Sequence, residues 1–157
     1  MKHVFWLLPG ALAGRSGPDQ SPWKAHDLRA GGIGAVLSVN DGVACHVEDF
    51  TALGMSYRCI PLSENAPPRD GDFEHCLNVL PEAYDYVRSE LDRQRSVLVH
   101  CTSGKDRTGL FMGYFLMRRS GLSVDDAIVA VWRVRPIALS AEGWEDLAAA
   151  VLAAVSH

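Results

Sequence analysis

The sequence lacks the features that mark several large classes of protein. No apolar run reaches the length of about 18 residues that a membrane-spanning helix needs. Only five apolar residues precede Pro9, which is too few for the core of a secretory signal peptide. The four cysteines, Cys45, Cys59, Cys76 and Cys101, show neither metal-ligand spacing nor the density of a disulfide framework. We therefore expect reduced thiols in a cytoplasmic protein with no bound metal and no membrane span.

Positive charge is also scarce. The formal net charge is −4, which argues against general binding to nucleic acid or to anionic membranes. The chain has no internal repeat, linker or low-complexity tract. With 157 residues, 48% hydrophobic and 22% charged, its composition is typical of a globular protein. We expect one domain over residues 1–157 that can bury a core.

The stretch from Ser96 to Gly109, SVLVHCTSGKDRTG, holds the clearest chemical signal. It begins with a short β-branched run that is typical of a buried strand, and His100 and Cys101 follow directly after this run. The residues that follow, LFMGYFLMRR, are apolar on nearly every face and predict a buried helix that begins at Arg107. A strand, a tight loop and a helix N-terminus would point several backbone N–H groups at one place, which predicts an anion site.

The residue types in this loop suit covalent transfer of a phosphoryl group. A helix N-terminus and a nearby arginine favour the thiolate form of a cysteine, so we predict Cys101 as the nucleophile. The planar fork of Arg107 can hold two phosphate oxygens, and the Thr108 hydroxyl can donate to the sulfur as it leaves. Such chemistry needs no metal and no cofactor. The residues predicted to surround the bound phosphate are Thr102, Ser103, Gly104, Lys105 and Gly109.

Strand-like and helix-like segments alternate along the rest of the chain. Strands are predicted over residues 4–8, 12–14, 33–39 and 57–62, and helices over residues 22–30, 47–53 and 73–91. Pro81 predicts a kink or a break in the third of these helices. Later helices are expected to start after Ser123, with an end at Pro136, and at Ser140. The alternation predicts an α/β fold, a single domain with a central, mostly parallel sheet flanked by helices.

The loop also carries a family resemblance. VLVHCTSGKDRTG closely resembles the HCxxGxxR[ST]G loop of the cysteine-dependent protein tyrosine phosphatase superfamily, in its dual-specificity and lipid-phosphatase branches. WLLPGALAG and GIGAVLSVND resemble early strands of bacterial dual-specificity-like phosphatases, so the likeness covers most of the chain. The resemblance implies a tyrosine-phosphatase-like fold and hydrolysis of phosphate monoesters through a phosphocysteine. The substrate would be a phosphorylated protein or a small phosphorylated molecule.

One departure from the family pattern concerns the general acid. IPLSENAPP resembles the mobile acid loop of that group, but Glu64 stands in the place of the usual aspartate. A glutamate is one methylene longer and can still protonate a leaving oxygen, so we predict Glu64 as the acid. Three rivals stay open. Asp70 and Asp72 follow on the same loop, and Asp106 lies in the signature loop, where some relatives with GKDRTG are thought to use that carboxylate.

A second departure lies in the late loop RPIALSAEGWEDL. Many relatives carry a glutamine there that positions the hydrolytic water, and Trp144 occupies its place in this sequence. Hydrolysis of the phosphocysteine would then rely on Glu64, Asp106 or unassisted water, and we expect slow turnover. We expect His100 to hydrogen-bond the loop. Lys105 is either solvated or, as in the lipid-acting branch, a second contact to phosphate-rich substrates.

Three functions from different classes compete at this point. The first is a phosphatase of the dual-specificity or tyrosine type, with phosphoinositides or small molecules as alternative substrates. The missing aspartate and glutamine suggest a phosphate-binding pseudophosphatase, and a cysteine in such a loop also suits a sulfurtransferase that carries a persulfide. Nucleotide-binding loops are excluded, because GKD lacks the required Ser or Thr and GIG lacks its third glycine. We expect a monomer, and a disulfide of Cys101 with another cysteine stays open.

Overall fold

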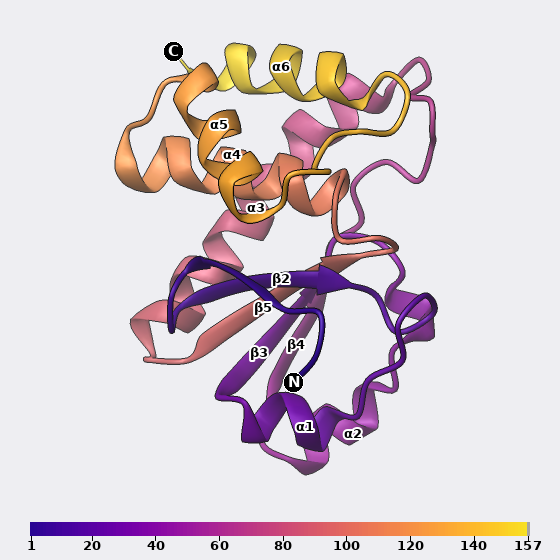
Figure 1. Cartoon of the computed structure of the whole chain (residues 1–157), viewed down its shortest axis with the longest axis vertical. Helices are drawn as coiled ribbons and strands as arrows, with labels where there is room; N and C mark the ends of the chain where they lie inside the picture. The colour runs from indigo at the N-terminus through magenta and orange to yellow at the C-terminus, as the bar shows by residue number, and fades with distance from the viewer. Residues whose placement is uncertain (157) are drawn as a thin grey trace.

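The computed structural model describes residues 1–156, which fold around a five-stranded sheet (Figure 1). The spatial order is β1 (Phe5–Leu8), β2 (Leu12–Ser16), β5 (Ser96–Cys101), β3 (Ile33–Ser38) and β4 (Ser56–Cys59). Strands β1 and β2 pair antiparallel, whereas β2, β5, β3 and β4 pair in parallel. The predicted α/β fold with a mostly parallel sheet is confirmed. Strand β5, which carries the chemical signal, lies at the centre of the sheet.

Helices cover both faces of this sheet (Figure 1). Helices α1 (Ala25–Ala30) and α2 (Val47–Ala52) lie on one face. The other face carries α3 (Asp72–Asp92), α4 (Arg107–Ser120), α5 (Val124–Val134) and α6 (Trp144–Val155). A short 3₁₀ helix, Gly42–Ala44, follows β3. The larger core lies under α3 to α6, and a smaller core lies under α1 and α2.

Alternation along β5 divides its side chains between the two cores. Val97, Val99 and Cys101 belong to the larger core, whereas Leu98 belongs to the smaller one. Helix α4 is apolar on nearly every face because it runs through the larger core, and it is buried from Arg107 to Leu116. Burial on both sides fixes β5 and α4 and thereby fixes the loop that joins them.

Most predicted elements are present, and the exact ends depend on local hydrogen bonds. Strand β5 ends at Cys101 and α4 begins at Arg107, as predicted. The Ser123 hydroxyl accepts a hydrogen bond from the backbone N–H of Asp126 at 3.1 Å and so caps α5. The predicted break at Pro81 is wrong, because α3 continues through this residue and packs a long apolar face on the core.

Two helix starts were predicted too early. Helix α1 begins at Ala25, because the carbonyl of Ser21 accepts a hydrogen bond from the Arg15 guanidinium. Helix α6 begins at Trp144, because the preceding loop is bonded to the loop that joins β5 to α4. The N–H of Ala141 donates to Asp106, and Ser140 contacts Lys105. Both errors arise from tertiary contacts. Among residues 1–156, no helix is long and apolar enough to cross a membrane.

Candidate active site

The candidate site lies where β5 ends and α4 begins, in the loop of residues 101–107. Cys101 ends β5 with only 1% of its surface exposed, and Arg107 opens α4. The carboxyl ends of the parallel strands β2, β3 and β4 lie at the same edge of the sheet. In open α/β sheets this edge is where the loops after the strands form ligand sites.

The carbonyl oxygens of residues 102–106 all accept hydrogen bonds from groups outside the loop. Arg135 donates to two of them, from Nη2 to Ser103 at 2.7 Å and from Nε to Gly104 at 3.2 Å. The other three oxygens, those of Thr102, Lys105 and Asp106, accept from the backbone N–H groups of Gly17, Gly109 and Leu139, and Leu110 respectively. The backbone of the loop is therefore oriented along its whole length.

The N–H groups of the same loop are left without acceptors. Across residues 1–156, none of the backbone N–H groups of residues 102–107 donates to another protein group. Backbone N–H groups buried in a fold nearly always have a partner. A run of N–H groups that lead into a helix N-terminus forms an anion-binding concavity, since their partial positive charges converge. The loop between Cys101 and α4 is therefore a candidate oxyanion site.

Gly104 is required where the loop passes the neighbouring strand. Its φ is +66°, in the left-handed region, and a Cβ there would lie 2.5 Å from the backbone carbonyl oxygen of Arg15. A side chain at this position would displace β2 or the loop. Gly109, also predicted beside the phosphate, lies within α4, where Ala138 and Leu139 approach it closely.

The side chains of Thr108 and Arg107 complete the surroundings of the thiol. The Thr108 hydroxyl donates to Sγ of Cys101 at 3.1 Å, which stabilises negative charge on the sulfur. Arg107 donates from Nε to the backbone oxygen of Ser63 at 2.7 Å. Its Nη1 and Nη2 groups have no acceptor within the described chain. The guanidinium is therefore anchored on one edge and keeps its two terminal nitrogens for an oxyanion.

Trp144 joins Arg107 to the loop of residues 60–71, which precedes α3. The indole ring is fully buried and lies 4.9 Å from the Arg107 guanidinium carbon, a distance at which cation–π attraction operates. Its Nε1–H donates to the backbone oxygen of Asn65 at 2.9 Å. The sequence signalled only that Trp144 replaces the family's glutamine. The structure shows that it positions both Arg107 and the 60–71 loop.

Glu64 lies beside the candidate site. Its neighbour Ser63 accepts the hydrogen bond from Arg107, and the next residue, Asn65, accepts the one from Trp144. These two backbone bonds hold the Glu64 segment against the 101–107 loop. Glu64 and Thr102 line the same cavity, whose volume is about 310 Å³. The carboxyl group of Glu64 is exposed and forms no hydrogen bond with another described residue.

The rival carboxylates on the 60–71 loop and at the start of α3 have other surroundings. Asp70 is exposed and has no hydrogen bond to the rest of the described chain. Asp72 is buried and accepts hydrogen bonds from the N–H of Arg69 and from the Asn65 amide. Burial acts to raise the pKa of Asp72, but these hydrogen bonds outweigh it and lower the pKa. Asp72 is thus a carboxylate that shapes the loop.

Asp106 and Lys105 point to the loop that precedes α6. Asp106 is buried and accepts from the N–H of Ala141 at 3.2 Å and from Lys105 Nζ at 3.0 Å. Lys105 Nζ also donates to the Ser140 hydroxyl at 3.2 Å. The ammonium and the carboxylate therefore neutralise each other and tie the 101–107 loop to the residues before Trp144.

Comparison with known proteins agrees with this geometry. Residues 23–150 match the family model of the dual specificity phosphatase catalytic domain. The chain belongs to this family. A crystal structure of Tk-PTP in its active form is similar with a TM-score of 0.77 and 20% identity, and covers 99% of this chain and 97% of its own. The crystal structure of human DUSP28 gives a TM-score of 0.74 at 19% identity, and the match covers 100% of this chain and 97% of that one.

A third crystal structure, of a mouse putative dual specificity phosphatase complexed with zinc tungstate, gives a TM-score of 0.73 at 20% identity. The match covers 99% of this chain and 89% of that one. At these identities the solved structures show a shared fold. The type of reaction follows from membership of the family: the chain is a cysteine-dependent phosphatase, and its substrates carry phosphate groups.

His100 directly precedes Cys101 and is held by hydrogen bonds in a neutral form. Its Nδ1 lies 3.2 Å from the Cys101 backbone oxygen, which can only accept, so Nδ1 carries the proton. Its Nε2 accepts from the Ser38 hydroxyl, which is bonded to the Tyr57 hydroxyl at 2.8 Å. The predicted hydrogen bond of His100 to the loop is confirmed. Burial lowers the pKa of His100 to about 4, and the nearby charge of Arg15 acts in the same direction.

The neutral state of His100 predicts how stability depends on pH. The imidazole takes up a proton near pH 6.5 when the chain is unfolded and only near pH 4 when it is folded. The stability gained by keeping His100 neutral is therefore fully present above pH 6.5. It is lost as the pH falls from 6.5 to about 4, at about 1.4 kcal/mol per pH unit. In NMR spectra the His100 ring signals should stay constant from pH 8 to about pH 5. A ring that titrates near pH 6.5 would contradict the assignment.

Proposed function

We propose that the phosphatase hydrolyses phosphate monoesters with Cys101 as nucleophile and the 101–107 loop as the phosphate site. The observation that carries this proposal is the run of unpaired N–H groups over residues 102–107 in a loop whose carbonyls are all bonded elsewhere. The three terminal oxygens of a phosphate dianion need several hydrogen-bond donors. The loop N–H groups and the two free nitrogens of Arg107 supply them. Thr102, Ser103, Gly104 and Lys105 would hold phosphate through their backbone.

In the first step the thiolate of Cys101 attacks phosphorus, and the bond between phosphorus and the ester oxygen breaks. The leaving oxygen takes a proton from the carboxyl group of Glu64, so the alcohol departs neutral. The charge that develops on the equatorial oxygens is met by the loop N–H groups and by Arg107. The Nε bond of Arg107 to Ser63 brings the acid-bearing loop to the same phosphate that the guanidinium holds.

In the second step water attacks the phosphocysteine, and Glu64, now ionised, accepts a proton from that water. The phosphorus–sulfur bond breaks, and Thr108 stabilises the departing thiolate through its 3.1 Å hydrogen bond. The position that holds a water-orienting glutamine in many relatives is filled by the buried indole of Trp144. Its contacts with Arg107 and Asn65 fix the loop instead. We expect this second step to be slow.

The finer substrate class is a phosphotyrosine or a phosphoserine/threonine side chain. Support comes from Lys105, whose ammonium is bonded to Asp106 and Ser140 and adds no free positive charge for a second phosphate group. This disfavours the phosphoinositide alternative. The preserved arrangement of Cys101, Arg107 and Thr108 disfavours a pseudophosphatase. We further propose that the chain acts as a cytoplasmic monomer, with no nucleic-acid partner and no cofactor.

The substitution Cys101→Ser tests the nucleophile. A serine hydroxyl is a much weaker nucleophile, so turnover of p-nitrophenyl phosphate should fall at least about a thousandfold. Binding of p-nitrophenyl phosphate, measured by calorimetry, should be preserved, because the N–H groups and Arg107 remain. As a control, Cys76→Ser changes another buried thiol and should keep most of the activity. Phosphate release by Cys101→Ser at more than a tenth of the original rate would contradict the proposal.

The general acid is tested by a pair of isosteric variants. Removing the acid should matter most for poor leaving groups, so Glu64→Gln should slow phosphotyrosine turnover about a hundredfold and p-nitrophenyl phosphate turnover much less. It should also flatten the basic limb of the pH–rate profile. Asp106→Asn should not show this leaving-group dependence, because both carboxylate oxygens of Asp106 are already bonded to Lys105 and Ala141.

Both variants must alkylate at Cys101 with iodoacetate at the unchanged rate, so that a distorted loop is not mistaken for a lost proton donor. If Asp106→Asn gives the leaving-group dependence and Glu64→Gln does not, the acid lies in the 101–107 loop, and Glu64 is only a neighbour of the site.

A further inference from the structure

A second cavity lies on the other face of the sheet, between the N-terminal segment, the end of β2 and helix α1. Its volume is about 530 Å³, within the range of about 300–1,000 Å³ that is typical of small-molecule sites. Lys2, Arg15, Trp23, Lys24 and Leu28 line it. In the parallel ladder Arg15 pairs with His100 and Ser16 pairs with Cys101, so Arg15 projects to the face opposite Cys101. The catalytic chemistry does not use this cavity.

Arg15 is the unusual residue of this cavity. It is only 2% exposed and forms no ion pair with an acidic group of the described chain. Its Nε donates to the backbone oxygen of Lys2, and its Nη1 donates to those of Ser16 and Ser21. The remaining nitrogen, Nη2, has no acceptor within residues 1–156. A buried guanidinium without a counter-charge is costly, and its pKa is lowered by burial.

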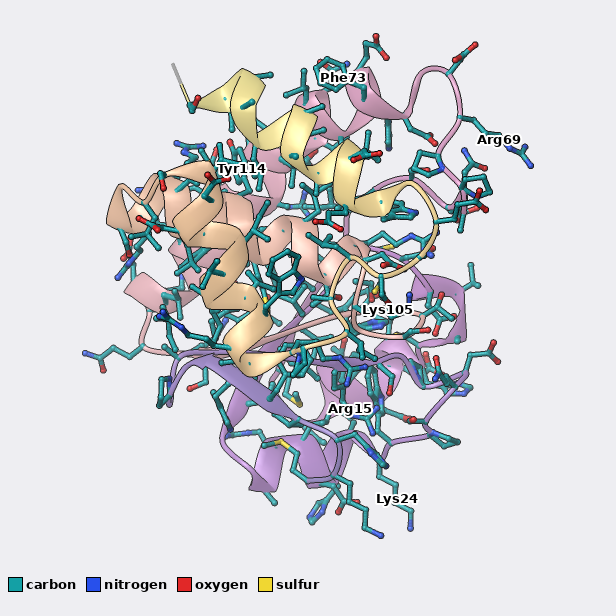
Figure 2. The ribbon with its side chains drawn as sticks, turned by 45° about the horizontal axis from the view of Figure 1, so that its top comes forward. Arg15, Lys24, Arg69, Phe73, Lys105 and Tyr114 are labelled. Atoms are coloured by element: carbon teal, nitrogen blue, oxygen red, sulfur yellow. The ribbon has the colours of Figure 1, made fainter. Side chains whose placement is uncertain are left out.

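The charges around the cavity leave an excess of positive charge. Lys2 and Lys24 line it with Arg15, and neither lysine forms an ion pair with another described residue. One acidic side chain, Asp27, also lines the cavity. Figure 2 shows Lys24 at the α1 end of the molecule, with Arg15 between it and Lys105. A positive cavity on a chain whose net charge is −4 is a local feature that attracts an anion.

The floor of the cavity is apolar and includes a fixed aromatic ring. The Trp23 ring lies 5.0 Å from the Arg15 guanidinium carbon, and its edge-on contact with the His100 ring has a centroid distance of 4.9 Å. These contacts hold the indole in place while part of the residue remains exposed. Leu28 and Pro22 extend the apolar surface. A planar group can stack there while a charged group reaches Arg15.

We propose that this cavity is a binding site for a small organic anion, a phosphonate, phosphate or carboxylate attached to an aromatic ring. The anionic group accepts hydrogen bonds from Nη2 of Arg15 and from the ammonium groups of Lys2 and Lys24. The ring lies on Trp23, Pro22 and Leu28. The site is separate from the 101–107 loop and does not depend on the catalytic roles proposed above.

The test uses a non-hydrolysable probe, 1-naphthylmethylphosphonate, and protein whose Cys101 has been carboxymethylated with iodoacetate to fill the 101–107 loop. Binding is followed by calorimetry and by the indole N–H signals in ¹H–¹⁵N NMR spectra. The Trp23 signal should shift more than those of the other tryptophans. Methylphosphonate and 1-naphthylmethanol, which carry only the anion or only the ring, should each bind at least about tenfold more weakly, because each loses one half of the contacts.

Two charge reversals on the same surface distinguish binding in the cavity from nonspecific electrostatic attraction of the anion. Lys24→Glu should raise the Kd of the probe roughly tenfold, whereas Arg29→Glu, on α1 but outside the cavity, should change it less than about twofold. Arg15→Met should abolish binding. If Arg15→Met does not fold, the comparison of Lys24→Glu with Arg29→Glu still tests the proposal. The proposal would be overturned if Lys24→Glu and Arg29→Glu weakened probe binding equally. It would also be overturned if another tryptophan showed the largest NMR shift, or if the probe did not bind.

Discussion

The hydrogen bonds from Arg135 to the carbonyl oxygens of Ser103 and Gly104 are the contacts on which the rest of the active site depends. A peptide group whose carbonyl is held outward must turn its N–H inward. With the neighbouring carbonyls held by backbone donors, the N–H groups of the 101–107 loop stay unpaired within the described chain and open to the proposed phosphate. Little reorganisation is then needed when charge develops in the reaction, and such preorganisation is the main source of electrostatic catalysis.

Arg107 and Trp144 connect the 101–107 loop to the segment that carries Glu64, the proposed general acid. The guanidinium contacts Ser63, the indole contacts Asn65, and Glu64 lies between these two residues in the chain. Arg107, the proposed phosphate ligand, and the segment that carries Glu64, the proposed acid, are therefore parts of one packed unit. Lys105 and Asp106, which form an ion pair, are bonded to Ser140 and Ala141 and so hold the same unit to the loop before α6. The departures from the family pattern at Glu64 and Trp144 fall within this single set of contacts.

The sequence was informative where the determinants are local. A β-branched run, a cysteine, two glycines and an apolar helix predicted the end of β5 and the start of α4, since all lie within a few residues of one another. The roles of Arg135, Ser63 and Trp144 could not be predicted, because each depends on a contact with a residue more than 30 positions away. Other contacts placed the starts of α1 and α6 later than their capping signals indicated: the bond from Arg15 to Ser21, and the bonds of Lys105 and Asp106 to the loop before α6.

The most direct test of the central claim is to trap the covalent intermediate. The protein is mixed with p-nitrophenyl phosphate, quenched with acid within milliseconds, digested and analysed by mass spectrometry. The account predicts one phosphoryl group on the peptide that contains Cys101, formed at the rate of an initial burst of nitrophenol, because hydrolysis of the phosphocysteine is the slower step. A burst with the phosphoryl group on another residue, or turnover with no phosphorylated peptide and no burst, would contradict it.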